Sequence, residues 1–262
     1  MEETLRKRVK VMFQTLINNI ALAACVVLLV FASYSDWKTR RVRNEVWLIM
    51  IAAGFAITVA RWVYTAELVT TIFSVIVSLI ISLPLYTIKI FGGADTKATI
   101  FVSLLIPKNI SASFTPFFPL TLFLNIFAIL GVLYLIILSY NLIGRLVRGS
   151  LFPGLESESK WRKMLALLTC IQSDLNSIHT KKHFYPVQQI TEKDGKIEMH
   201  LIPPRRALDN TSTLKLLKSK VNHLPSNRIW VYFKKPLMPI ILISVIISFF
   251  LGDLPMFLLN FF

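Results

Sequence analysis

Long runs without charged residues constrain this chain most strongly. Such runs occupy residues 46–60, 68–88, 109–144 and 237–252, and a further one extends from Val11 to Ser35. A membrane helix needs about 17–25 predominantly apolar residues, and each run supplies that length together with its flanks. Charged residues make up only 16% of the chain, whereas roughly a quarter is usual in soluble domains. The pattern therefore predicts an integral membrane protein.

The predicted fold is an all-α polytopic membrane bundle of about six transmembrane helices, with a small α+β cytoplasmic domain inserted before the last helix. The expected spans are about 13–35, 45–64, 67–90, 95–107, 117–143 and 236–258. The fourth span is too short to cross ~30 Å of hydrocarbon unless neighbouring helices or a wet membrane edge shield it. The first span follows a basic segment, as in a signal peptide, but it ends in Asp36 without a small-residue cleavage site. We therefore expect it to be retained.

The chain is expected to divide into a membrane domain at 1–143, a basic polar domain at 144–235 and a final membrane helix within 236–262. The polar domain contains 17 Lys and Arg residues against 7 Asp and Glu residues. Its pattern predicts an α+β domain, because Asp-Gly favours the positive φ angles of a tight hairpin turn. The predicted elements are a helix at Glu156–Ser173, a hairpin at His183–Ile202 turning at Asp194-Gly195, and a helix at about Thr213–His223.

The formal net charge of +15 is explained by retention of Lys and Arg on the cytoplasmic face, beside anionic lipid. No nucleic-acid partner is predicted, because no groove-reading motif accompanies the charge. Two expected spans separate Asp36 from Asp95, so both should lie on one face, and the basic residues beside Asp36 indicate that it is cytoplasmic. The same count places the basic N-terminus outside the cell, in conflict with the positive-inside rule.

Acidic residues at the span edges are the candidates for chemistry. They are Asp36, Glu45, Glu67, Asp95 and Asp253, whereas all four histidines fall in the polar domain. The chain has no HExxH zinc helix and no Gly-x-Ser-x-Gly elbow, and the two cysteines form no CxxC pair. No cofactor and no metal site are predicted.

Asp36 and Asp95 are candidates for a functional pair on one face, since two buried carboxylates that lie close together share a proton. One then activates water while the other donates to a peptide carbonyl. Gly92 and Gly93 are expected to form a sharp turn, with the next helix beginning at Asp95. A plainer interpretation makes Asp95 a helix N-cap and Asp36 the point where the first helix meets water.

Three blocks of sequence resemble the archaeal preflagellin and prepilin peptidases, within the type IV prepilin peptidase family of GxGD membrane aspartyl proteases. They are Ser33–Asn44 around Asp36, Gly92–Ala98 around Asp95, and Arg228–Val231 followed by Pro236 and Gly252-Asp253. The resemblance implies that Asp36 and Asp95 are the catalytic pair and that they cleave a short basic leader before an apolar helix, at the cytoplasmic membrane edge. It also implies that the partners are prepilin or preflagellin leaders and membrane lipids.

The resemblance implies supporting roles for further residues of these blocks, namely Gly92, Gly93, Ala94, Lys38, Asn44 and Lys97. Snorkelling of the two lysines to the interface is the simpler explanation of their positions. Two positions depart from the family pattern. Ala94 stands where the GxGD motif has Gly, and Arg43 stands where relatives often have Pro. A cysteine-rich region like that of bacterial relatives is absent, so methyl transfer is not implied.

Two rival functions fit the same span pattern. A transporter or channel also places acidic residues at membrane helices, where they relay protons or bind cations. The lack of evident internal repeats counts slightly against that class. An inactive scaffold with the same fold is the other alternative.

Overall fold

The computed structural model describes residues 2–65, 67–109, 115–174, 183–193, 196–203 and 228–259 of the chain. It divides into two compact units. The first, which we term the helical unit, comprises Met1–Leu130 and Pro236–Phe262, and the second, the sheet unit, comprises Gly131–Lys235. The protein is mostly helical, with a small sheet-containing region, as the sequence predicts.

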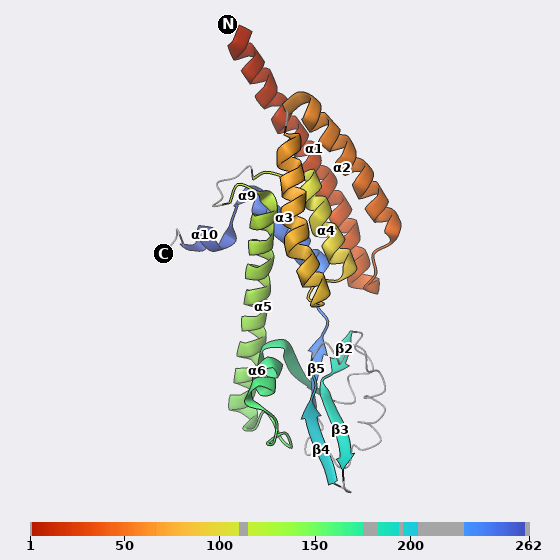
Figure 1. Cartoon of the computed structure of the whole chain (residues 1–262). Coiled ribbons are helices and arrows are strands. Elements are labelled where there is room, and N and C mark those ends of the chain that lie inside the picture. The colour runs from red at the N-terminus through yellow and green to blue at the C-terminus, as the bar shows by residue number, and fades with distance from the viewer. Residues whose placement is uncertain are drawn as a thin grey trace. The chain divides into compact units, whose positions relative to one another are not determined.

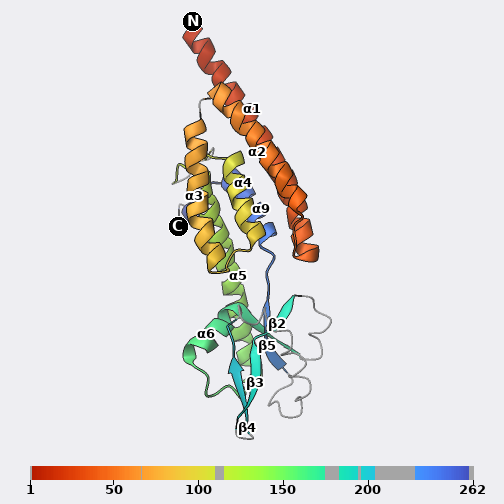
Figure 2. The same ribbon diagram turned by 45° about the vertical axis from the view of Figure 1, so that its right-hand side comes forward.

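Helices make up most of the described part of the helical unit. They are α1 (Glu2–Thr39), α2 (Asn44–Thr65), α3 (Leu68–Thr87), α4 (Gly93–Leu105), the beginning of α5 (Phe118–Arg148), α9 (Leu237–Phe250) and α10 (Leu254–Leu259). The short helix α4 lies between α3 and the α1–α2 pair (Figures 1 and 2) and also contacts α9. Its position is therefore central, and most of its residues are buried by these neighbours.

Four helices of the described residues are long and apolar enough to cross a membrane. The candidate segments are Arg8–Thr39, Asn44–Thr65, Leu68–Thr87 and Phe118–Val147, in α1, α2, α3 and α5. Helices also form at the other two expected positions, but α4 has 13 residues and α9 has 14. The structure thus supports four of the six predicted spans by length and composition, as expected for a multi-pass membrane protein.

The last predicted span, 236–258, is not one continuous helix. Gly252 has a left-handed φ of +77°, and the chain restarts as α10 at Leu254 (Figure 1). Asn125 of α5 stabilises this break: its Nδ2 donates to the Gly252 carbonyl at 2.8 Å and its Oδ1 accepts from Leu254 N–H at 2.7 Å. A buried amide thus bonds backbone groups at the break, and hydropathy gave no sign of it.

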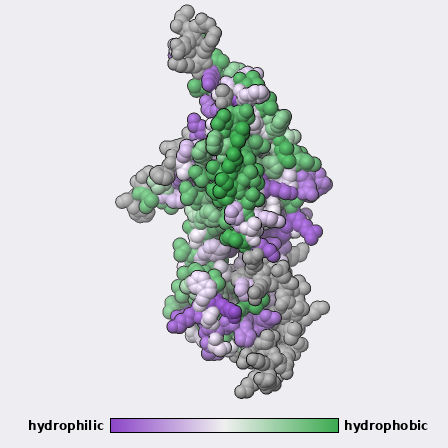
Figure 3. Space-filling view, in the orientation of Figure 1, coloured by the Kyte–Doolittle hydropathy of each residue, from purple (hydrophilic) through white to green (hydrophobic). Residues whose placement is uncertain are grey.

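Helix α3 has an inverted distribution of polarity. Its buried face carries Thr71, Ser74, Ser78 and Ser82, whose spacing of three or four residues follows the helical turn. Its exposed face is apolar and gives the green band at the front of the helical unit in Figure 3; it includes Val69, Ile72, Phe73, Ile76 and Ile80. Small residues at helix contacts and apolar residues outside are typical of membrane helices, because lipid is the outer solvent.

Two small antiparallel sheets and one helix form the described part of the sheet unit with the end of α5. The first sheet has the order β1 (Cys170–Asp174), β5 (Arg228–Phe233), β2 (Phe184–Pro186), and β3 (Gln188–Lys193) pairs with β4 (Lys196–Leu201) in the second. Trp230 is buried in the core, where it stacks on Phe152 at a centroid distance of 4.9 Å and donates from Nε1 to the Leu151 carbonyl.

The predicted elements of this unit are corrected in two places. The helix expected at Glu156–Ser173 is shorter, because Ser159 caps helix α6 (Lys160–Thr169) and Cys170–Asp174 pair with β5 as a strand. The predicted hairpin is present as β3 and β4, but residues 184–186 join the other sheet. The turn Asp194-Gly195 and the predicted helix Thr213–His223 lie outside the described residues.

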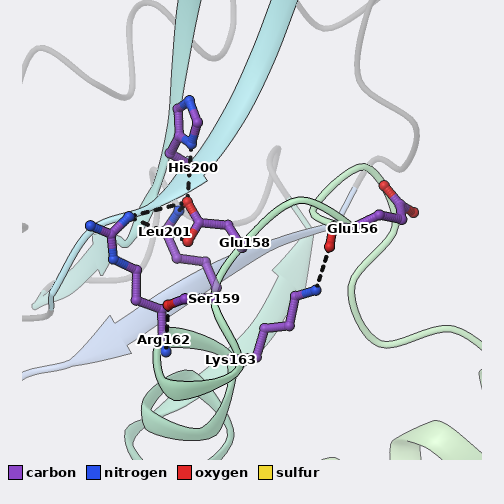
Figure 4. A network of polar contacts seen from close by, with 7 residues as sticks. All are labelled: Glu156, Glu158, Ser159, Arg162, Lys163, His200 and Leu201. Atoms are coloured by element: carbon purple, nitrogen blue, oxygen red, sulfur yellow. Dashed lines mark hydrogen bonds and ion pairs between the residues drawn. The ribbon is translucent and has the colours of Figure 1, made fainter.

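A buried carboxylate links α6 to the second sheet. Glu158 accepts hydrogen bonds from Arg162, from His200 Nδ1 at 3.0 Å and from the Leu201 N–H at 3.1 Å (Figure 4). Burial raises the pKa of Glu158, but the bonds from Leu201, His200 and Arg162 outweigh it and hold the pKa below its usual value. The ionised form therefore stabilises this junction.

Candidate active site

Asp36 lies near the C-terminal end of α1, on the face that packs into the helical unit. Cys25, Leu29 and Ser33 precede it on this face and are buried. The Asp36 side chain is half-buried, and its Oδ2 accepts a hydrogen bond from the backbone N–H of Met238 at 3.4 Å. Met238 is in the first turn of α9, where N–H groups have no partner within the helix and the dipole favours negative charge.

Asp95 lies in the first turn of α4 and is 8% exposed. Its Oδ2 accepts a hydrogen bond from the Gly92 N–H at 2.7 Å, and the Thr96 hydroxyl donates to the Gly92 carbonyl at 3.1 Å. The helix begins at Gly93 with Gly92 as the cap, so the prediction that it begins at Asp95 is wrong by two residues. The carboxylate therefore reaches back over the helix start.

The turn before Asp95 is also formed differently from the prediction. Helix α3 ends at Thr87, and the left-handed residue of the connection is Lys89, with φ of +58°, whereas Gly92 has an ordinary φ of −82°. Gly92 matters through close approach instead, because a Cβ there would stand 3.1 Å from Asp95 Oδ2. Phe91 is buried and stacks on Phe123, which anchors this turn to α5.

The structure places Asp36 and Asp95 at the same end of the helical unit. Arg61 donates to the Leu104 carbonyl at 3.4 Å and to Asn18 Oδ1 at 3.2 Å, so the last turn of α4 lies beside the middle of α1. Figures 1 and 2 show that α4 begins at the same lower end of this unit at which α1 ends, so the first turn of α4, with Asp95, lies toward the end of α1 that carries Asp36. In addition, α1 and α4 contact each other, and both contact α9.

The other predicted site residues lie on the surface or near it. Lys38, Lys97 and Asn44 are exposed, and Lys38 Nζ lies 5.8 Å from the centre of the Tyr34 ring. Gly93 is exposed as well, and Ala94 is half-buried. Among the described residues, no group of three or more His, Cys, Asp or Glu side chains is placed to hold a metal ion.

Sequence reasoning missed two structural features at this end of the unit. The Met238 N–H contacts Asp36 across 202 residues of chain, and no local pattern indicates such a contact. Arg40 is half-buried, whereas the neighbouring Lys38 and Arg41 are exposed. No sequence signal singled out Arg40 among these basic residues, because its inward turn depends on a left-handed φ of +57° just after the end of α1.

Sequence comparison places the chain in the peptidase class, and the four long apolar helices fit a multi-pass membrane protein. Residues 23–136 match the type IV leader peptidase family, and residues 162–254 match the archaeal peptidase A24 C-terminus, type II. The two matches together span most of the chain, which therefore belongs to the type IV leader peptidase family. The resemblance predicted from the three sequence blocks is confirmed.

A curated relative agrees with this assignment. The chain is similar to a preflagellin peptidase of Methanococcus voltae, with 26% identity over 248 residues. The alignment covers 89% of this chain and 96% of the relative, so both the helical unit and the sheet unit are included.

Proposed function

We propose that this protein is a membrane aspartyl endopeptidase that removes the short basic leader from preflagellin- or prepilin-like proteins. Asp36 and Asp95 are the proposed catalytic residues. The observation that carries the proposal is their common position at one end of the helical unit, where each carboxylate accepts a hydrogen bond from a backbone N–H at a helix start. The family match and the preflagellin peptidase relative support a leader as the substrate.

The proposed mechanism needs the two carboxylates to share one proton. Helix N-termini favour an ionised carboxylate, whereas two negative charges close together disfavour a second ionisation. One aspartate therefore remains charged and takes a proton from the attacking water. The other is neutral and donates a hydrogen bond to the peptide carbonyl as the tetrahedral centre forms.

The proposed topology keeps six spans. Helix α4 is about 20 Å long at about 1.5 Å per residue, and its partial burial by neighbouring helices would reduce its contact with lipid within the membrane. The two aspartates and the 144–235 domain are proposed to lie on the cytoplasmic side. Because that domain is basic, it suits anionic lipid headgroups better than a basic leader. The match to a peptidase family does not favour the transporter alternative.

The test is leader cleavage of a co-expressed preflagellin. We expect Asp36→Asn and Asp95→Asn each to abolish the shortened product, because both changes keep size and remove the acid. Glu45→Gln is the matched control at the same end of the unit: Glu45 is exposed and pairs with Arg43 at 3.2 Å, so cleavage should persist. Cleavage retained in either Asn variant, with the protein accumulating normally in the membrane, would refute the assignment.

A further inference from the structure

Of the four basic residues that follow Asp36 closely, one turns its side chain into the protein. Lys38, Arg41 and Arg43 are exposed. Arg40 is half-buried, and its Nε and Nη1 atoms are fully removed from solvent. The four basic residues therefore do not all lie in solvent as a signal for membrane orientation, and the position of Arg40 needs a separate explanation.

The local backbone directs this inward turn. Helix α1 ends at Thr39, and Arg40 has a left-handed φ of +57° while its N–H donates to the Asp36 carbonyl at 3.0 Å. The hydroxyls of Ser35 and Thr39 both donate to the Arg41 carbonyl, at 2.7 and 3.0 Å. A left-handed conformation is uncommon for a residue with a side chain. Here the hydroxyl bonds hold the turn, and the turn keeps Arg40 beside Asp36.

Charge limits the candidate partners of the Arg40 side chain to the acidic residues of the neighbouring helices. A buried guanidinium needs acceptors, preferably anionic ones. The later half of α1 and the helices α2, α4 and α9 that pack against it offer three acidic residues: Asp36, Glu45 and Asp95. Glu45 is exposed and bound to Arg43, whereas Asp95 is buried and Asp36 half-buried. Lys97, two residues after Asp95, is exposed and therefore does not compete with Arg40 as a buried positive charge.

We propose that Arg40 is a positioning residue of the peptidase site, whose guanidinium holds the Asp36 and Asp95 carboxylates electrostatically. The inference rests on the proposed function of that pair. Arginine stays protonated at all working pH values, so its charge is a fixed influence. It favours the ionised states of both carboxylates and thereby sets the pH range in which the pair holds one proton.

The sign of the effect follows from the charge. Removal of a positive charge makes ionisation of a neighbouring carboxyl group less favourable, so both limbs of a bell-shaped pH profile should move upward. A neighbouring opposite charge changes a carboxyl pKa by about one to three pH units. Exposed Lys38 and Lys97 act through water and should contribute much less.

The experiment is a pH–rate profile of kcat/KM for leader cleavage by the purified full-length protein in lipid nanodiscs. Arg40→Gln should displace both limbs upward by about one pH unit or more. Arg40→Lys keeps the charge but loses the planar fork, so its limbs should stay near those of the native protein while the rate falls. Arg41→Gln removes an adjacent but exposed charge and should leave the profile unchanged.

The outcomes separate this inference from the proposed function. A loss of rate that is equal at every pH in Arg40→Gln, with no displacement of the limbs, would overturn the role of Arg40. An upward displacement of the limbs in Arg40→Lys would also overturn that role. This second variant keeps the test available if Arg40→Gln fails to fold. Cleavage that survives Asp36→Asn or Asp95→Asn in the same preparation would instead overturn the peptidase assignment itself.

Discussion

Gly92 and Asp95 act together at the residue scale. The glycine N–H donates to the Asp95 carboxylate at 2.7 Å, and the absence of a glycine side chain lets that oxygen approach the backbone. Gly92 therefore positions the Asp95 carboxylate, whereas the chain reverses direction at Lys89. The spacing of the motif predicted a turn but not which residue adopts the left-handed conformation.

Gly92→Ala should lower the cleavage rate about tenfold without unfolding the protein, because small misplacements of a catalytic group are costly. The new Cβ would stand 3.1 Å from Asp95 Oδ2, so the carboxylate must shift by a few tenths of an ångström. The matched change Gly93→Ala meets only the Tyr86 ring at 3.8 Å and should cost much less. Equal rates for the two variants in a cleavage assay would contradict this role of Gly92.

At the scale of elements, charge-free runs predicted the positions of the long helices well. Burial and long-range contacts decided the rest. Helix α4 has only 13 residues, and neighbouring helices bury most of them. The break at Gly252 depends on Asn125, which lies 127 residues away in the chain. Strand β1 forms because Cys170–Asp174 pair with β5, a partner that the local sequence does not reveal.

The junction between α6 and β4 should depend on pH. The pKa of Glu158 is held below its usual value, so its stabilising effect is present above the unfolded-state pKa of about 4.3 and is lost as pH falls through the folded-state pKa. Glu158→Gln should destabilise the sheet unit by about 1–3 kcal/mol at neutral pH, since the donors lose a charged acceptor.

Hydrogen exchange of the Leu201 amide in the full-length protein measures this effect, because that amide bonds Glu158 directly. The control is Glu156→Gln, since Glu156 is exposed. Protection of Leu201 that is unchanged in Glu158→Gln, or lost equally in the control, would show that the Glu158 contacts do not stabilise the junction.

At the scale of the whole molecule, the proposed function requires both aspartates to face the cytoplasm. The first helix is continuous from Glu2, so the basic N-terminal segment extends the first span rather than forming a separate element. The proposed topology therefore keeps the N-terminus outside, together with Lys108 after α4. Lys89, before Asp95, should lie on the cytoplasmic side.

Cysteine labelling in intact cells tests this orientation, in a background without Cys25 and Cys170, which are both buried. Cysteines at the exposed positions Thr4 and Lys108 should react with an impermeant maleimide from outside. A cysteine at Lys89, which is also exposed, should react only after permeabilisation. The reverse pattern would move the aspartate pair to the outer face and exclude cleavage at the cytoplasmic edge.

The central claim is that Asp36 and Asp95 perform one chemical step together. The most direct measurement is the single-turnover rate of preflagellin cleavage by purified Asp36→Asn, Asp95→Asn and the double variant. Residues that act as a unit are strongly non-additive, so all three should fall to the same residual rate. Near-native cleavage in either single variant, or a double variant whose loss is the product of two partial losses, would contradict the account.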